Sequence, residues 1–356
     1  EYFWWGSVFL VNVPIVALAL VLTVWLIPAD RLQHKASLAG WDYTSSLQAM
    51  VAMVSLVLSI KELAKPAPSL GFAALMGILS AVVLAVFVRR QLRRPQPLIE
   101  LRLFRIPTFS GGVIAAVVAA VALVGVELVF SQRLQLVLGL SPLQAGLAIL
   151  PIPVAAFVAG PIAGWALSRL GTHRLILAGL LVSAVALCAL TMSLNTGAHS
   201  LQKIAVLAVL GLGVGATITA ASNAVMNSAP PEHAGMAASV EEVSYEFGGV
   251  LGVALLGSVL SWRYTSSLVL PANLQATGAS DGIDAALLAA EKLPPEAAAQ
   301  LLGLAHAAFD QGFMAVMATA VVLVLAAALA VALLRSRGQQ QATVGHRSGA
   351  VASEGH

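Results

Sequence analysis

Long apolar runs recur along the whole chain and are separated by short stretches of proline, glycine and charge. Each run holds about 20 residues, the length at which an α-helix crosses the ~30 Å hydrocarbon core of a bilayer. Only 10% of the 356 residues are charged, against about 25% in soluble globular domains. The pattern predicts an all-α polytopic membrane protein with nine transmembrane helices, at residues 5–27, 42–64, 69–88, 107–136, 142–168, 173–194, 202–227, 236–262 and 311–334.

Two segments fall outside this pattern. Residues 263–310 carry acids among alanines and leucines, which favours short amphipathic helices outside the membrane. The tail at 338–356 is polar and poor in apolar side chains, so we expect it to be disordered. The chain also begins with Glu1 rather than with a methionine, and it enters an apolar run at once, which suggests a start part-way through a longer protein.

The basic residues predict how the chain is oriented, because lysine and arginine accumulate in cytoplasmic loops. Six arginines lie in residues 89–105. Placing this segment inside puts thirteen of the nineteen lysines and arginines inside, including Arg31 and Lys35, with the C-terminus cytoplasmic. The excess of basic residues therefore indicates topology, and we expect these residues to contact anionic lipid headgroups. We expect no nucleic-acid partner.

Nothing in the sequence indicates an enzyme, a metal site or a bound cofactor. The pattern of glycines at 211–216 loosely matches a dinucleotide fingerprint, but it lies inside an apolar helix without the strand that the motif needs. Close helix packing explains small residues there better. The seven histidines are scattered without ligand spacing, and no Ser/His/Asp arrangement stands out.

Carboxylates inside the apolar runs are the candidate functional groups, since an acid within the membrane is costly and marks a functional site by default. Glu127 lies near the outer part of the fourth predicted helix. The alternative is a protonated acid that only bridges helices.

The stretch SVEEVSYEFGGVLGVALLGSVL at 239–260 carries Glu241, Glu242 and Glu246. Glu242 and Glu246 are four residues apart and share one helix face, where two carboxylates in a low dielectric cannot both ionise readily. Such a pair can hold a proton or release it when a cation arrives. For Glu241 and Glu242 the alternative is a helix N-terminus facing water. Tyr245 and Phe130 could add aromatic faces that suit a lipophilic cation, although each aromatic could equally be packing.

Several stretches together resemble the fourteen-helix drug:proton antiporters of the major facilitator superfamily, and within them the methyl viologen and quaternary ammonium efflux pumps of the SmvA type. The resemblance covers most of residues 1–335 and rests on WGSVFLVNVP (5–14), QPLIELRLFRIPTFSGG (96–112), SPLQAGLAILP (141–151), GPIAGWALSRLGTHR (160–174) and EEVSYEFGGVLGVALLGS (241–258).

The resemblance implies a partial major facilitator fold that contains helices six to fourteen. It implies a last helix of the N-terminal half at 1–30, an additional helix pair with a cytoplasmic linker at 31–95, a six-helix C-terminal half at 96–337, and the tail. Five N-terminal helices would be missing, and the longer protein would supply them.

Residues of the family carry over only where this sequence matches. The three glutamates at 241–246 resemble thirteenth-helix acids that recognise cations or couple protons, and Glu127 resembles a ninth-helix acid. The second copy of the cytoplasmic loop motif corresponds to Gly164, Arg169, Gly171 and Arg174. Ser168 replaces the usual aspartate of that motif, and Ala156 replaces a tenth-helix aspartate of some relatives, which weakens the inference about divalent cations.

The resemblance thus implies proton-coupled export of hydrophobic organic cations across a bacterial inner membrane, with the proton gradient as energy source, no cofactor, and partners limited to cations, protons and lipid. This part of the protein would be inactive alone. Two alternatives stay open: a transporter of another small metabolite, and a truncated membrane scaffold that transports nothing.

Overall fold

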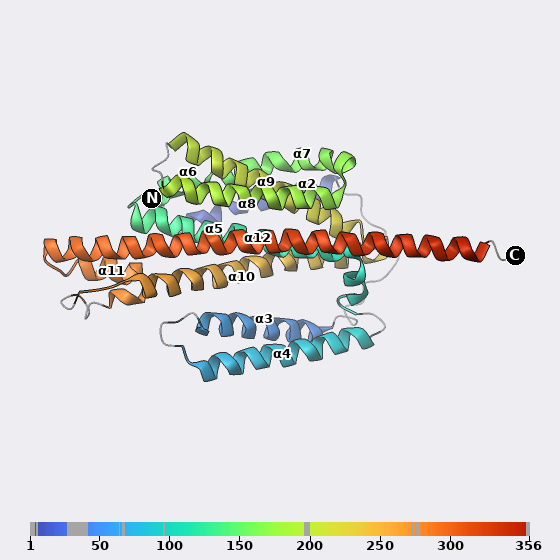
Figure 1. Ribbon diagram of the computed structural model, residues 1–356, viewed down its shortest axis with the longest axis horizontal. Coiled ribbons are helices and arrows are strands. Elements are labelled where there is room, and N and C mark those ends of the chain that lie inside the picture. Colours follow the sequence, from blue (N-terminus) through green and yellow to red (C-terminus); the bar gives the residue numbers. More distant parts are fainter. Residues whose placement is uncertain are drawn as a thin grey trace. The chain divides into compact units, whose positions relative to one another are not determined.

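The computed structural model describes residues 4, 6–26, 42–63, 65, 68–94, 97–195, 200–271, 274 and 278–353. Every regular element among them is a helix, which confirms the all-α prediction (Figure 1). Arg31 and Lys35, which the orientation prediction counts, lie outside the described residues. The elements are α1 Ser7–Leu10, α2 Asn12–Leu26, α3 Tyr43–Leu63, α4 Leu70–Arg93, η2 Leu101–Arg105, α5 Pro107–Gln132, η3 Arg133–Val137, α6 Pro142–Ile149, α7 Pro151–Leu170, α8 Thr172–Asn195, α9 Ser200–Met226, η4 Pro231–His233, α10 Ala234–Ser267, η6 Ala279–Asp281, α11 Ile283–Ala290 and α12 Pro295–Ser353.

In the described part of the chain, eight helices are long and apolar enough to cross a membrane, one fewer than the sequence predicts. The difference lies at the first predicted helix, where the structure has the short α1 followed by the 15-residue α2. Pro14 accounts for the break: it has no N–H to bond the Leu10 carbonyl, and its ring crowds that group. At 1.5 Å per residue α2 spans about 22 Å, short of the hydrocarbon core.

The chain divides into two compact units, Glu1–Ser46 and Leu47–His356. The first contains α1 and α2. The second contains the predicted additional helix pair, α3 and α4, and the six-helix region from α5 onward. The domain boundaries after residues 30 and 95 that the resemblance implies stay a prediction.

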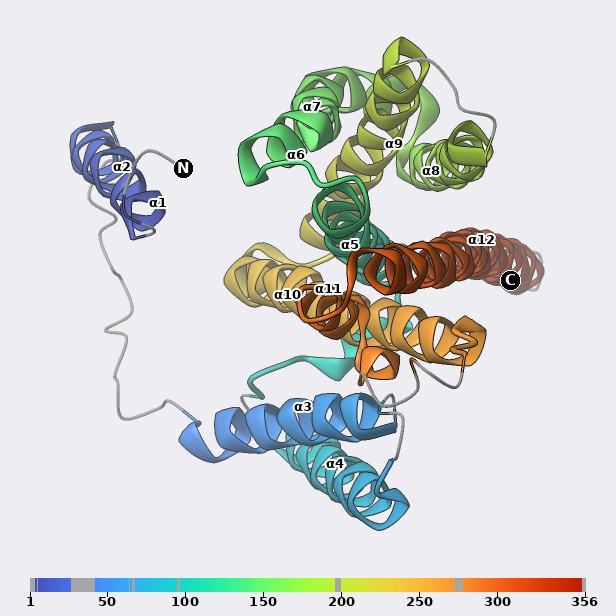
Figure 2. The ribbon, with the colours of Figure 1, turned by 90° about the vertical axis from the view of Figure 1, so that its left-hand side faces the viewer.

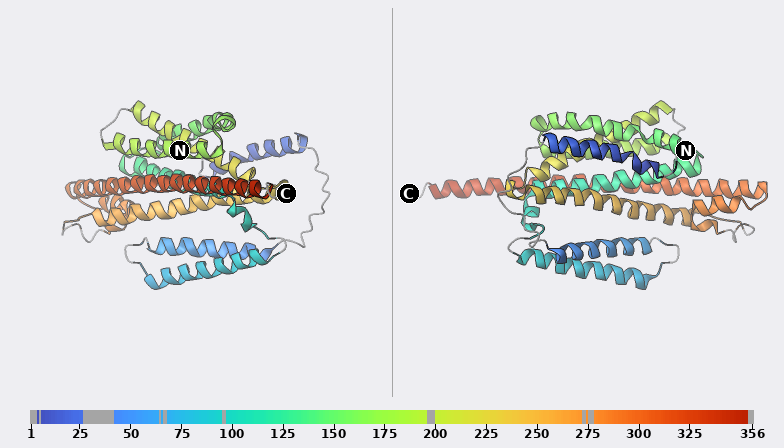
Figure 3. Two further views of the ribbon diagram at one scale, coloured as in Figure 1. Left: turned by 45° about the vertical axis from the view of Figure 1, so that its right-hand side comes forward. Right: turned by 180° about the vertical axis from the view of Figure 1, so that it is seen from behind.

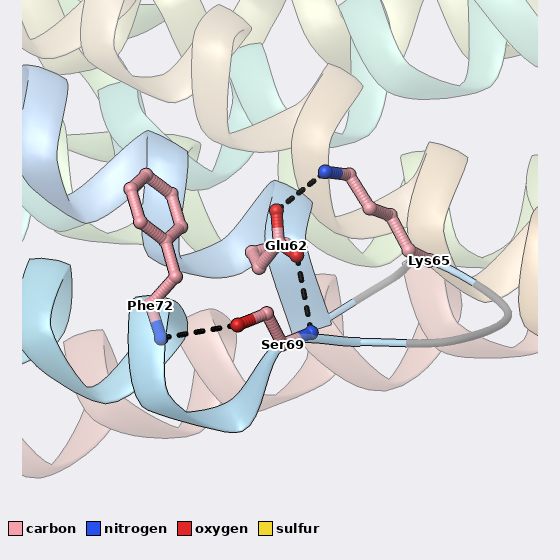
Figure 4. Close-up of polar contacts among 4 residues, drawn as sticks. All are labelled: Glu62, Lys65, Ser69 and Phe72. Carbon is pink, nitrogen blue, oxygen red and sulfur yellow. Dashed lines mark hydrogen bonds and ion pairs between the residues drawn. The ribbon is translucent and has the colours of Figure 1, made fainter.

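Hydroxyl groups join the two helices of the α3–α4 hairpin. Ser80 donates to the carbonyl of Ala52 at 2.8 Å, and Ser59 donates to the carbonyl of Ala73 at 2.9 Å. The turn is closed by Glu62, which accepts from the Lys65 ammonium at 2.5 Å and from the backbone N–H of Ser69 at 3.1 Å (Figure 4). In lipid, the two serine bonds satisfy hydroxyl groups that water cannot reach.

In the six-helix region α5 is the central element. It packs against α10 and α12 on one side and against α9 and α8 on another (Figure 2). The helices α5, α10 and α12 run side by side in all views (Figure 3). The span 142–170 consists of α6 and α7, which are separated at Leu150 because Pro151 begins the second helix.

Glycines let the backbones of α5 and α10 touch. A Cβ on Gly252 would lie 2.5 Å from the Val121 carbonyl oxygen, and a Cβ on Gly125 would lie 2.7 Å from the Gly252 carbonyl oxygen. Within the 211–216 pattern, Gly211 and Gly215 do the same between α9 and α7: a Cβ on Gly215 would lie 2.6 Å from the carbonyl oxygen of Ala156. Gly213 faces α8, where its Cβ would lie 2.7 Å from the Ser183 nitrogen. This confirms the close helix packing expected for that pattern.

The last helix is much longer than predicted. α12 begins at Pro295, so the sequence was wrong to begin the helix at 311, and the region of short helices is confined to η6 and α11. Asp310 lies within this helix, where an ion pair to Arg133 accommodates its charge. α12 also continues to Ser353, over most of the tail expected to be disordered. No proline interrupts this stretch, and extending a formed helix costs far less than nucleating one.

Candidate functional site

The three glutamates of α10 lie within the helix rather than at its start. α10 begins at Ala234, about two turns before Glu241, and its first turn carries no acid. The alternative in which Glu241 and Glu242 complement a helix N-terminus is therefore wrong. Glu241 is half-buried, whereas Glu242 and Glu246 are exposed on the surface of the isolated helix bundle.

A large cavity brings part of this stretch together with α5. Its volume is about 1060 Å³, and Glu246 and Tyr245 lie in its wall. Most of the wall is apolar, with Leu123 and Val124 from α5 and Val250 from α10. Glu246 is the one carboxylate among the described residues that line it; Glu241 and Glu242 do not. A lone acid in an apolar cavity suits a lipophilic cation.

Tyr245 is tethered while it lines this cavity. Its hydroxyl donates to the backbone carbonyl of Ile218 on α9 at 3.2 Å, and Ile218 also lines the cavity. This bond satisfies the polar end of the side chain and leaves the ring as part of the wall. Sequence reasoning found the residue but not the bond, because the bond joins two helices and its two residues are 27 positions apart in the chain.

Two lysines that sequence reasoning did not associate with the acids also line the larger cavity. They are Lys61, at the end of α3, and Lys65, in the turn after it. The Lys65 ammonium is paired with Glu62, as Figure 4 shows. No lysine or arginine neighbours Glu246 along the chain, but the cavity wall does include positive charge.

Glu127 lies in a second, smaller cavity. This cavity has a volume of about 390 Å³, and its wall includes Ser131 of α5, Ile149 of α6 and Pro153 of α7. Leu128 lines both cavities. The structure therefore brings Glu127 and Glu246 to neighbouring cavities rather than to one.

Phe130, expected to line a substrate site, lines neither cavity. It is 5% exposed and packs against Phe313 of α12, with ring centroids 6.0 Å apart. Its aromatic ring serves the interface between α5 and α12. Its position in the structure is therefore that of a packing residue, the alternative to a substrate contact.

The residues of the expected loop motif surround the turn between α7 and α8. Gly171 ends α7 with φ of 76°, a left-handed conformation that favours glycine, and its N–H donates to the Leu167 carbonyl at 3.0 Å. The Arg169 guanidinium lies over the Trp165 ring at 4.0 Å. A Cβ on Gly164 would meet nothing within 4 Å. Ser168, which stands in the place of the aspartate, donates to the Trp165 carbonyl at 2.8 Å. Arg174 is at the start of α8.

An ion pair that sequence reasoning missed joins α5 to α12. Arg133 donates through Nε to Oδ1 of Asp310 at 2.8 Å and through a terminal nitrogen to Oδ2 at 3.4 Å. The partners are 177 positions apart, so no local pattern could reveal them.

Comparison with known proteins places this architecture in a family. The model of the Major Facilitator Superfamily matches residues 112–277, which run from α5 through α10 into the following loop. Across most of its length, the chain is also similar to curated efflux proteins. It is 36% identical over 312 residues to the methyl viologen resistance protein SmvA of Salmonella typhimurium, covering 87% of this chain and 62% of that protein.

The chain belongs to the major facilitator superfamily. It is a multi-pass membrane protein of that family, with a partial major facilitator fold.

Two further relatives support the assignment of the chain to this superfamily. It is 37% identical over 339 residues to the multidrug efflux pump LfrA of Mycolicibacterium smegmatis, covering 93% of this chain and 65% of the pump. It is 29% identical over 356 residues to the tetracenomycin C resistance and export protein of Streptomyces glaucescens, covering 95% and 64%. The chain thus spans less than two thirds of the length of these relatives.

Proposed function

We propose that this chain is the larger part of a proton-coupled exporter of hydrophobic organic cations, such as quaternary ammonium compounds and methyl viologen. The observation that carries the proposal is Glu246, which lies with the Tyr245 ring in a mainly apolar cavity lined chiefly by α5 and α10 and also by α3. The acid attracts a positive charge, and the aromatic ring and aliphatic wall accept its lipophilic body. The names of the relatives, which describe methyl viologen resistance and drug efflux, agree with this chemistry.

In this proposal Glu246 holds the organic cation, and Glu127, in the neighbouring cavity, is a second group for a cation or a proton. Protons entering from outside displace the drug, and loss of the proton inside resets the site. The protein lies in a bacterial inner membrane with its C-terminus inside, draws its energy from the proton gradient and needs no cofactor. A further part of the protein, like the part of the relatives that this chain does not span, completes the translocation path.

The test is efflux of tetraphenylphosphonium from cells that express the complete reading frame encoding this chain, with and without a protonophore. We expect gradient-dependent efflux that falls about tenfold in Glu246→Gln, the loss of about 1.4 kcal/mol of cation attraction. Glu242→Gln is the matched control, since Glu242 lies on the same helix face but outside the cavity lining, and it should change efflux less than about twofold. Equal effects of the two substitutions would refute the assignment of Glu246.

One observation favours a second candidate, a transporter of an anionic or zwitterionic metabolite. Lys61 and Lys65 line the same cavity as Glu246, and a positive wall suits a negative group. Pairing with Glu62 compensates Lys65, which leaves Lys61 as the residue that distinguishes the candidates. Lys61→Gln should leave the efflux of an organic cation unchanged or raised, whereas an anion transporter would lose its transport activity.

A further inference from the structure

Arg133 begins the single-turn π-helix that closes α5. The N–H of Leu138 donates to the Arg133 carbonyl at 3.1 Å, five residues back, as in other π-turns at helix C-termini. The contacts of the Arg133 side chain are what set this residue apart. The side chain is only 13% exposed and points to α12, where both carboxylate oxygens of Asp310 accept from it. Its guanidinium also lies 5.6 Å from the centre of the Phe313 ring.

This charge is close to the smaller cavity. Arg133 follows Glu127 by six residues, or about 9 Å along the helix axis. At an effective dielectric constant of about 20, a free unit charge about 9 Å away changes the binding of a cation by roughly ten- to twentyfold. The forked contact with Asp310 cancels that charge and holds it on the α12 side of the helix, whereas Glu127 and Ser131 line the cavity next to α6 and α7.

We propose that Asp310 is a positioning residue for the cation site at Glu127: it neutralises Arg133 and so keeps the field at that carboxylate negative. This inference rests on the proposed function in one respect, namely that the ligand of the smaller cavity is a cation. It assigns to α12 an electrostatic part in selectivity, although Asp310 lines neither cavity.

The test is the affinity for tetraphenylphosphonium of the purified protein, made from the complete reading frame and carrying Glu246→Gln, so that the cation site at Glu127 is the one measured. Asp310→Asn leaves Arg133 uncompensated and should weaken binding about tenfold. Arg133→Gln breaks the same contact but removes the positive charge, so binding should be unchanged or tighter. In a Glu127→Gln background Asp310→Asn should weaken binding less than about twofold, because the cation is then no longer held beside that carboxylate, near Arg133.

A purely structural role of the contact between Arg133 and Asp310 predicts a different pattern of binding. The proposal is overturned if both single substitutions weaken cation binding to the same extent. It is also overturned if Asp310→Asn weakens the binding of neutral triphenylphosphine oxide as much as it weakens the binding of the cation. If Asp310→Asn does not fold, Arg133→Gln decides alone, and weaker cation binding in that variant overturns the proposal. A protein that shows the expected binding pattern but exports nothing would refute the proposed function and leave this inference supported.

Discussion

At the scale of single residues, the structure separates acids that look equivalent in the sequence. Glu241, Glu242 and Glu246 lie within two turns of one helix, yet only Glu246 of the three lines the described cavity. Glu127 lies in a different cavity that shares Leu128 with the first. The residue type identified these acids as candidates, because charge is rare in apolar helices. The direction in which each points depends on the neighbouring helix.

Tyr245 offers a residue-scale prediction, because its ring and its hydroxyl have different roles. Tyr245→Phe removes the bond to Ile218 and should lower stability by about 1 kcal/mol, while cation affinity stays within about twofold. Tyr245→Leu also removes the aromatic face and should weaken cation binding by about two- to fivefold. Thermal unfolding and equilibrium binding on purified protein measure the two effects. A loss of affinity in the phenylalanine variant as large as in the leucine variant would contradict the role of the ring.

At the scale of elements, α5 and α10 pack tightly against each other and together form one wall of the larger cavity. Gly125, Gly248 and Gly252 bring the two backbones together, so that the residues next to them on α10, Gly249 and Val250, reach the cavity wall. Apolar side chains gain little by leaving lipid, so close packing of this kind is what holds membrane helices together. Which helix packs against these glycines is decided only in the tertiary structure.

The element-scale prediction concerns that contact. Gly252→Val places a side chain against the Val121 carbonyl and should destabilise the protein by about 1–3 kcal/mol. Gly235→Ala is the matched control on the same helix, since a Cβ there meets nothing within 4 Å. It should be neutral or slightly stabilising, by less than about 1 kcal/mol. The midpoint of thermal unfolding in detergent reports both, and equal midpoints for the two variants would argue against a tight contact.

At the scale of the whole six-helix region, the two ends of the bundle differ in charge. The arginine-rich segment with η2 lies at the beginning of α10, where Glu100 pairs with His233 at 3.1 Å. The loop with η6 lies at the other end of α10, where the Tyr264 hydroxyl donates to the Ala279 carbonyl at 3.0 Å. The first end carries Arg102 and Arg105, so loop charge predicts that it faces the cytoplasm.

Labelling of single cysteines tests this orientation. In a cysteine-free background that includes Cys188→Ala, a membrane-impermeant maleimide added to intact cells should label Glu291→Cys and leave Arg102→Cys unlabelled. Both positions are exposed, so access rather than burial decides the result. Permeabilised cells provide the control, because both variants should then react. Labelling of Arg102→Cys alone in intact cells would reverse the orientation.

The sequence by itself determined the class of the molecule: an all-α membrane protein, the approximate positions of its spans, and the acids worth testing. These features follow from hydropathy and from the cost of charge in lipid, both of which are local. The tertiary structure alone decided that Asp310 lies within a helix and pairs with Arg133, that Phe130 is packed away from the cavities, and that Lys61 lines the same cavity as Glu246. Contacts between helices far apart in the chain leave no periodic signature, because each depends on how two faces meet in space.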